Sequence, residues 1–189
     1  MSVFSVVLAA GSARRFGAPK QLAEFQGQSL VARAVRLGQQ ANESKTVLVV
    51  GARWRHVVDD CSSLAPFIVR NEHFESGMAS SIASGIRAVQ PVADAALILL
   101  ADQPLITADH LSAMQNAWIE SPDSIVASGF SEVVGPPVIF PASYFCELLR
   151  LHGDHGARSV IVENNEAVIK IPFADAAVDI DTPDDLKNI

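Results

Sequence analysis

Cysteine is scarce in this sequence of 189 residues, which contains only Cys61 and Cys146. The two residues lie far apart and match no metal-binding or redox spacing. We therefore expect both to be small, buried and reduced side chains of a cytoplasmic protein, with a disulfide as the less favoured alternative. The histidines also lack the spacing of metal ligands, which argues against a structural zinc site.

Positive charge is limited as well. The formal net charge is −7, which argues against nonspecific nucleic-acid binding. Any anionic substrate must therefore be met by a local basic cluster. Apolar runs are too short to cross a membrane, and the apolar residues near the start follow no basic leader. We accordingly expect neither a membrane span nor a signal peptide.

Common catalytic motifs are missing too. The sequence has no GxSxG elbow and no GxxxxGK[ST] loop, which argues against an α/β-hydrolase and a P-loop NTPase. The first predicted strand is not followed by GxGxxG, so a dinucleotide-binding dehydrogenase is unsupported. Hydrophobic residues nevertheless make up 49% of the chain and charged residues 19%, which excludes a disordered chain. We expect residues 1–189 to form one domain.

The stretch from Val6 to Lys20 reads VVLAAGSARRFGAPK, an apolar strand that leads into a loop containing glycine, Arg14, Arg15 and Lys20. Small residues let backbone N–H groups approach phosphate oxygens, and guanidinium and ammonium groups neutralise phosphate charge. On its own, the pattern is that of either a solvated basic turn or a polyphosphate site.

Strand-like and helix-like segments alternate along most of the chain. Apolar runs predict strands at 3–9, 45–50, 66–70, 94–101, 124–128 and 168–171. Helical spacing and capping residues predict helices at 29–40, 54–61, 143–151 and 157–163, and after residues 77, 107 and 182. The proline-containing segment at 133–141 is predicted to include an extended stretch at 138–140 that forms an edge or antiparallel strand. This alternation predicts an α/β fold, with a mainly parallel sheet covered by helices on both faces.

Ligands of such sheets bind outside the carboxyl ends of the strands. Asp102 ends the most apolar predicted strand, and its carboxylate is either a Mg²⁺ ligand or part of an ordinary turn. Asp181 is a candidate second ligand or a capping acid, and Asp179 competes for the same role. Lys20 and Arg15 are candidates to hold phosphate oxygens.

Two further segments have polar groups near predicted helices or glycines. The segment at 77–81 resembles a helix N-terminus with hydroxyls, which would bind an anion or would simply allow close helix packing. His155 lies in a glycine-flanked loop, where it would contact either substrate or solvent.

Together these motifs resemble a known family. Leu8-Ala9-Ala10-Gly11, followed by Arg15, Gly17 and Lys20, resembles the LAAGxSxRxGxxK signature of nucleotidyltransferases with a glycosyltransferase-A-like fold. The segment from Asn71 to Gly85 resembles the NxxxxxGMxxS motif of the MobA-like NTP transferases that build molybdenum cofactors. Further motifs follow in that family's order over nearly the whole chain: Asp102-Gln103-Pro104, Gly135-Pro136-Pro137, Gly153-Asp154-His155-Gly156-Ala157-Arg158 and Asp179-Ile180-Asp181-Thr182-Pro183.

The resemblance implies a three-layer, Rossmann-like fold of the nucleotide-diphospho-sugar transferase type. It implies transfer of CMP from CTP to molybdopterin with Mg²⁺ as cofactor, and release of pyrophosphate. The implied catalytic residues are Lys20, Arg15 and Asp102, and the implied metal ligands are Asp102 and Asp181. The implied nucleotide-binding residues are Leu8, Ala9, Ala10, Gly11, Arg15, Lys20, Gly77, Ser80, Ser81 and Asp102. Ala10 favours CTP, because guanylyltransferase relatives have glycine there, and the 153–158 loop would face the pterin.

The chain departs from the family pattern at Ala13, where a serine is usual, and at Phe16, where a methionine is usual. Loss of the hydroxyl removes one phosphate hydrogen bond, worth on the order of 1 kcal/mol. The alternatives are a related transferase with another phosphate acceptor and a non-catalytic protein that binds or inserts the molybdenum cofactor. The resemblance also implies a molybdenum hydroxylase as client, with no nucleic-acid or membrane partner.

Overall fold

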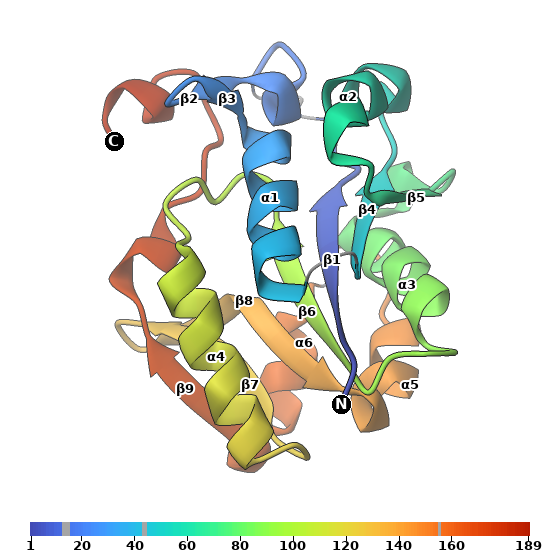
Figure 1. The fold of residues 1–189 in the computed structure, drawn as a ribbon, viewed down its shortest axis with the longest axis vertical. Coiled ribbons are helices and arrows are strands. Elements are labelled where there is room, and N and C mark those ends of the chain that lie inside the picture. Colours follow the sequence, from blue (N-terminus) through green and yellow to red (C-terminus); the bar gives the residue numbers. More distant parts are fainter. Residues whose placement is uncertain (13–15, 43–44, 155) are drawn as a thin grey trace.

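The computed structural model describes residues 1–12, 16–42, 45–154 and 156–189. Its main sheet has seven strands in the order β5-β4-β1-β6-β8-β7-β9 (Figure 1). The strands are β1 (Val3–Ala9), β4 (Thr46–Val50), β5 (Phe67–Arg70), β6 (Ala95–Leu100), β7 (Ile125–Phe130), β8 (Val133–Pro141) and β9 (Val168–Pro172). Every strand predicted from an apolar run is therefore present, with small shifts at the ends.

Most neighbouring strands run in the same direction. β5, β4, β1 and β6 are parallel, and β9 is parallel to β7. The register of β1 with β6 runs from Val3 opposite Ala95 to Leu8 opposite Leu100. The carboxyl ends of these two central strands therefore finish side by side.

β8 is antiparallel to both of its neighbours, β6 and β7. The antiparallel direction was one of the predicted alternatives, but β8 lies inside the sheet and the edge position is wrong. The register with β7 shifts between Ala127 and Ser128, and Pro136 and Pro137 fall in the resulting bulge. Bulged residues leave the regular ladder, so prolines are tolerated there inside a sheet.

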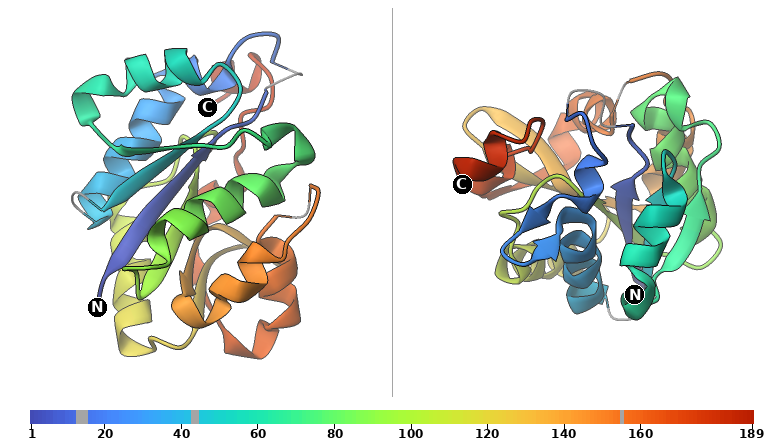
Figure 2. Two further views of the ribbon diagram at one scale, coloured as in Figure 1. Left: turned by 90° about the vertical axis from the view of Figure 1, so that its right-hand side faces the viewer. Right: turned by 90° about the horizontal axis from the view of Figure 1, so that it is seen from above.

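Helices cover both faces of the sheet, as predicted (Figure 2). One face packs against α1 (Leu30–Asn42), α2 (Trp54–Asp60) and α4 (Ala108–Glu120), and the other against α3 (Met78–Val89), α5 (Phe145–Leu149) and α6 (Arg158–Glu163). In β1, Val6 and Leu8 join the core beneath α3, whereas Val7 and Ala9 join the core beneath α1. Successive strand side chains point to opposite faces, so an all-apolar strand fills both cores.

The predicted caps of α1 and α4 are confirmed. Ser29 Oγ accepts a hydrogen bond from the Ala32 N–H at 3.1 Å, and Thr107 Oγ1 accepts one from the His110 N–H at 3.2 Å. A small antiparallel hairpin of β2 (Glu24–Phe25) and β3 (Gln28–Ser29) precedes α1 and was not predicted.

The predicted terminal helix is wrong, because Asp185–Lys187 forms only a 3₁₀ turn. The Asp185 carboxylate accepts the N–H groups of Asp181 at 2.8 Å and Thr182 at 2.7 Å, and these bonds lower the pKa of Asp185. A capping signal marks where a helix can begin, whereas a short helix also needs an apolar face to bury. The residues after Thr182 offer little of such a face.

The two cysteines have different environments. Both thiols are free, but Cys61 is buried and Cys146 is exposed, so the expected burial of Cys146 is wrong. In α5 the buried positions are Phe145 and Leu148, and Cys146 is directed outward. Burial, aided by the charge of Asp60, raises the pKa of the Cys61 thiol to about 12.

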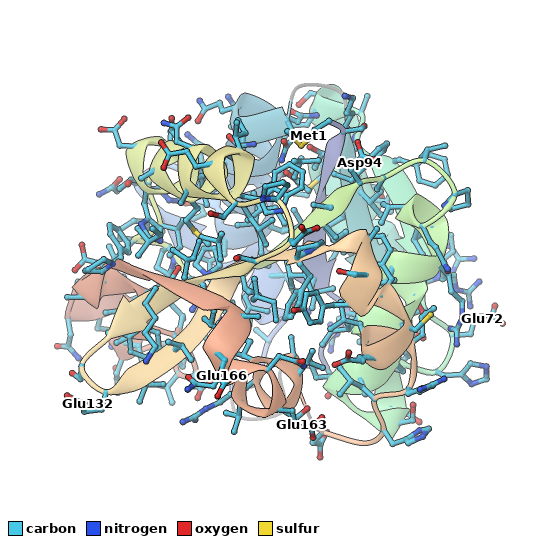
Figure 3. The ribbon with its side chains drawn as sticks, turned by 90° about the horizontal axis from the view of Figure 1, so that it is seen from below. Met1, Glu72, Asp94, Glu132, Glu163 and Glu166 are labelled. Atoms are coloured by element: carbon cyan, nitrogen blue, oxygen red, sulfur yellow. The ribbon has the colours of Figure 1, made fainter. Side chains whose placement is uncertain are left out.

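Figure 3 views the end of the molecule where the chain begins, away from the carboxyl ends of β1 and β6. Met1 and Asp94 lie close together there, and Asp94 Oδ2 accepts the Ser2 N–H at 2.6 Å. Within the described part of the chain, no helix has both the length and the apolar character of a membrane span.

Candidate active site

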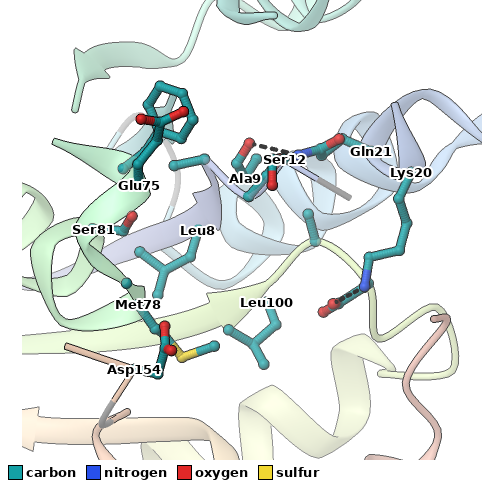
Figure 4. Close-up of a pocket in the computed structure, with 16 residues that line it drawn as sticks. Leu8, Ala9, Ser12, Lys20, Gln21, Glu75, Met78, Ser81, Leu100 and Asp154 are labelled. Carbon is teal, nitrogen blue, oxygen red and sulfur yellow. Dashed lines mark hydrogen bonds and ion pairs between the residues drawn. The ribbon is translucent and has the colours of Figure 1, made fainter. Parts of the chain in front are cut away.

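The loops after the parallel strands β1, β5 and β6, together with Asp154 from the loop after α5, surround a cleft of about 450 Å³. Figure 4 shows Lys20 on one side of this cleft and Glu75, Met78 and Asp154 across it. The described residues that line the cleft are Leu8, Ala9, Ala10, Gly11, Ser12, Lys20, Gln21, Phe74, Glu75, Gly77, Met78, Ser81, Leu100, Ala101, Asp102 and Asp154. The cleft thus lies at the edge where parallel α/β sheets bind ligands.

Lys20 joins two carboxylates at the cleft. Its Nζ lies 2.6 Å from Asp102 Oδ2 and 3.2 Å from Asp181 Oδ1. The side chain of Lys20 is 16% exposed, that of Asp102 27% and that of Asp181 57%, so water screens the Asp102 pair less. Burial alone would lower the pKa of Lys20, but Asp102 and Asp181 together raise it above its usual value. Lys20 therefore stays positively charged in the cleft.

A short 3₁₀ turn, Lys20–Leu22, places this ammonium, whereas the sequence predicted an irregular segment. Gln21, the second residue of the turn, is 7% exposed. Its Nε2 donates to Ala9 O at 3.1 Å and to Gly11 O at 2.5 Å. These bonds attach the turn to the end of β1, next to the β6 strand that carries Asp102 at its end.

A small apolar cluster brings the C-terminal segment to the cleft. Its buried members are Phe25, Leu30 and Ile180, and Phe16, Ala23, Leu105 and Leu186 pack against them. The Ile180 N–H also donates to Asp102 O at 2.9 Å. Burial of Ile180 therefore fixes the neighbouring Asp181 beside Lys20.

Asp179, the rival of Asp181, has a different environment. The residue is exposed overall, but the surrounding protein partly desolvates its carboxylate. This desolvation and the charge of Asp102 raise the pKa of Asp179 to about 6, against the opposing effects of Gln103 and Lys20. Of the two acids, only Asp181 makes a direct ion pair with Lys20 within the described residues.

Asn71 supports the wall of the cleft that precedes α3. Its Nδ2 lies 2.8 Å from Ser80 Oγ and 3.0 Å from Ser81 Oγ, and its Oδ1 accepts the His73 N–H at 2.9 Å. Ser80 Oγ also lies 2.9 Å from His73 O and 2.8 Å from Gly77 O. The Ser80 hydroxyl thus ties the loop to the helix, and only Ser81 of the two serines is among the described cleft residues.

Gly77 connects this wall to the loop after α5. Its φ is +104°, and a Cβ there would lie 2.3 Å from the backbone of Gly153. The Ala79 N–H donates to Gly153 O at 3.1 Å. This close backbone approach brings Asp154 to the cleft, so glycine is needed at position 77 for both conformation and space.

Most of the predicted nucleotide-binding residues therefore meet at one cleft, and Ser80 lies behind its wall. Arg15, Ala13 and His155 lie outside the described residues. Sequence reasoning missed Ser12, Gln21, Phe74, Glu75, Met78, Leu100, Ala101 and, as a cleft residue, Asp154. Asp154 belonged to a motif already noted, and Gln21 follows Lys20 directly. Phe74 and Leu100 gave no signal, because apolar cleft residues and core residues look alike in a sequence.

Asp102 and Asp181 are the described residues best placed to hold a divalent cation, because both carboxylates reach the position of one ammonium nitrogen. Mg²⁺ prefers oxygen ligands and often takes one or two protein carboxylates, with phosphate oxygens and water completing its shell. No group of three or more His, Cys, Asp or Glu side chains in the described residues is arranged to hold a metal. The donor set therefore fits a cation that arrives with a phosphate-bearing ligand.

Comparison with known proteins finds a matching family model and relatives that align along most of the chain. The family model of the MobA-like NTP transferase domain matches residues 5–168. The purine catabolism protein PucB of Bacillus subtilis is 28% identical over 97% of this chain and 93% of its own length. The molybdenum cofactor cytidylyltransferase of Escherichia coli is 20% identical over 95% of this chain and 91% of its own length.

A further curated relative and a solved structure are also similar to this chain. The bifunctional protein GlmU of Rhodospirillum rubrum is 32% identical over 67% of this chain, which spans only 28% of the length of that protein. The crystal structure of Rv0371c from Mycobacterium tuberculosis superposes with a TM-score of 0.86 at 26% identity, covering 100% of this chain and 96% of that one.

The fold and these similarities define a nucleotidyltransferase. Since the family model covers most of the sequence, the chain belongs to the MobA-like NTP transferase family.

Proposed function

We propose that this protein transfers CMP from CTP to molybdopterin and releases pyrophosphate. The observation that carries the proposal is the Lys20 ammonium, held between Asp102 and Asp181 in the same cleft as the small-residue loop at 8–12. Such a cation beside a backbone loop suits a triphosphate. The named activity of the E. coli cytidylyltransferase relative supports the choice of substrates.

The reaction needs alignment and charge neutralisation more than proton transfer. A terminal phosphate oxygen of the acceptor attacks the α-phosphorus of CTP, and a P–O bond forms as the bond to the pyrophosphate oxygen breaks. The attacking oxygen is already anionic, so no general base is required. Lys20 neutralises phosphate charge, and the 8–12 loop orients the nucleotide.

Asp102 and Asp181 would hold Mg²⁺, which, when bound, offsets charge on the triphosphate. Rv0371c has also been solved as a complex with manganese, which supports a divalent cation in this fold. Arg15 would bind two phosphate oxygens through its planar guanidinium. Ala13 supplies no hydroxyl to the loop, so we expect a modest loss of phosphate affinity at that position.

The two sides of the cleft suggest how the substrates are arranged. Lys20 and Asp102 lie on the side assigned to the triphosphate, with Ala10 as the residue that favours cytosine. Phe74 and Met78 give the opposite side apolar surface for a planar ring. The pterin of the acceptor would lie there, near the 153–154 loop, and the product would serve a molybdenum hydroxylase in the cytoplasm.

A transferase with another phosphate acceptor is the second candidate. The similarity to PucB over nearly the full length of both chains favours it, because that protein is named for purine catabolism and not for a molybdenum cofactor. The GlmU similarity points the same way. The presence of Lys20 and Asp102 in the cleft favours either transferase over a non-catalytic binding or insertion protein.

Pyrophosphate release tests the proposal. CTP, GTP, UTP and ATP are each supplied with Mg²⁺ and with molybdopterin, a sugar phosphate or a polyol phosphate. We expect release with CTP and molybdopterin. Release that requires another acceptor would establish the second candidate, and molybdopterin binding without any release would establish the non-catalytic one.

A matched pair of lysine variants locates the activity. Lys20→Met should reduce turnover by about 100-fold or more, since it removes a preorganised charge from the reacting phosphates. Lys187→Met is the control, because Lys187 also bonds a carboxylate, Asp184, at 2.6 Å but is 73% exposed. Near-normal turnover by Lys20→Met would refute the assignment of the cleft.

A further inference from the structure

Gln21 is a buried polar residue whose side-chain hydrogen bonds, within the described part of the chain, go to the loop that would hold the nucleotide. Its side-chain amide donates to Ala9 O, the last carbonyl of β1, and to Gly11 O in the loop. Gln21 is 7% exposed, so water competes little for these bonds. The residue also lines the cleft, directly after Lys20 in the chain.

These bonds determine the direction of the loop's N–H groups. A peptide unit is planar and trans, so its N–H points away from its carbonyl. Holding Ala9 O and Gly11 O therefore fixes the N–H groups of Ala10 and Ser12. The Ala52 N–H donates to Ala10 O at 3.1 Å, which fixes the N–H of Gly11 in the same way.

The loop needs such a restraint. Gly11 has no Cβ, is exposed, and would meet no atom within 4 Å if a Cβ were added. A free glycine samples both signs of φ, and its ordering on ligand binding would carry a large entropy cost. The two bonds from Gln21 reduce that freedom before any ligand arrives.

We infer that Gln21 is a positioning residue that holds the 9–12 loop in the conformation that binds the nucleotide. The inference rests on the proposed function, because it assigns the loop's N–H groups to the triphosphate. Gln21 acts through the backbone and need not touch the reacting atoms. An amide is required at this position, since a glutamate has the same shape but, when ionised, cannot donate and would repel both carbonyls.

The test compares Gln21→Glu with Gln115→Glu. We call the pair of hydrogen bonds from the Gln21 side-chain amide a clamp. Gln115 in α4 makes an equivalent clamp away from the cleft, donating to Ala41 O at 3.0 Å and Asn42 Oδ1 at 2.7 Å. For each variant, the KM for CTP, the KM for the acceptor, kcat and the unfolding midpoint are measured. Gln21→Glu should raise the KM for CTP about tenfold or more, the size of effect expected for one lost hydrogen bond, with the acceptor KM unchanged.

The control separates positioning from general stability. Gln115→Glu should leave the KM for CTP unchanged, even where it lowers the unfolding midpoint as much as Gln21→Glu does. Gln21→Met removes the donor without adding charge, and it should raise the KM for CTP in the same direction. A CTP KM within twofold of wild type in both Gln21 variants would overturn the inference, as would equal rises in the KM for CTP and for the acceptor.

A failure of the proposed function can be distinguished from a failure of the inference about Gln21. If the wild-type protein releases no pyrophosphate with any of the four nucleotides, the proposed function fails. The clamp is then tested by equilibrium binding of CTP with Mg²⁺. Binding by wild type about tenfold tighter than by Gln21→Glu would support the clamp, whereas equal binding, or none by either protein, would overturn it.

Discussion

The ion pair between Lys20 and Asp102 should stabilise the fold measurably, whereas a surface pair of the same length should not. Lys20 Nζ–Asp102 Oδ2 and Lys187 Nζ–Asp184 Oδ1 are both 2.6 Å long. Their side chains are 16% and 27% exposed in the first pair, but 73% and 78% exposed in the second. Because the lengths match, the difference between the pairs reports the effect of burial.

The expected coupling energies of the ion pairs follow from the exposed fractions of their side chains. A hydrogen bond to a charged group that is shielded from water contributes about 1.5–3 kcal/mol, which we expect for the coupling of Lys20 to Asp102. An exposed pair is screened and must order two flexible side chains, so we expect about 0–0.5 kcal/mol for Lys187 and Asp184. The longer pair of Lys20 with Asp181, whose side chain is 57% exposed, should lie between them, below about 1 kcal/mol.

Double-mutant cycles measure the couplings directly. One cycle uses Lys20→Met and Asp102→Asn, and the other uses Lys187→Met and Asp184→Asn, with urea unfolding of each single and double variant at neutral pH. Raising the salt concentration should weaken the surface coupling more than the shielded one. Equal coupling energies in the two cycles, or none between Lys20 and Asp102, would refute the reasoning that burial sets the strength of the cleft pair.

Gly77→Ala should lower the free energy of unfolding by about 3 kcal/mol, because the residue has a φ of +104° and its new Cβ would meet the backbone of Gly153. Urea unfolding measures this loss, and a loss of stability below about 1 kcal/mol would contradict the prediction. Ser29→Ala should lower stability by about 1 kcal/mol and the melting temperature by about 2–4 °C, because Ser29 Oγ caps α1 through the Ala32 N–H. Burial lowers the pKa of His110 from 6.5, so the unfolded state takes up this proton first and stability should fall as the pH drops below about 6.5. His110→Asn should reduce that fall, and an unchanged pH dependence in the variant would show that other groups cause it.

The meeting of Lys20 with Asp102 could be predicted in outline from the sequence. Each residue follows an apolar run that is typical of a buried parallel strand, and the carboxyl ends of parallel strands share one edge of a sheet. The order of the strands within the sheet could not be predicted from the sequence. Only the structure places β1 directly beside β6, and that neighbourhood brings the two side chains to hydrogen-bonding distance.

Other parts of the cleft could not be predicted, because residue type alone does not define them. Ser80 and Ser81 are equivalent in the sequence, yet one hydroxyl supports the loop behind the wall and the other lines the cleft. The same holds for Cys61 and Cys146, of which one is buried and one is exposed. In each pair the outcome depends on which way the local backbone directs the side chain, and the residue type of a small polar or weakly apolar side chain does not predict that direction.

The position of Asp181 follows from a local sequence pattern and not from the order of the strands. It follows β9 at the far edge of the sheet, so the rule that places Lys20 and Asp102 at one edge does not apply to it. The segment at 179–181 nevertheless alternates acid, isoleucine and acid, which in an extended chain buries the middle side chain and directs the two acids elsewhere. Ile180 is 0% exposed and its N–H is bonded to Asp102 O, so the burial of one apolar residue holds this segment beside Asp102, where Asp181 forms its ion pair with Lys20.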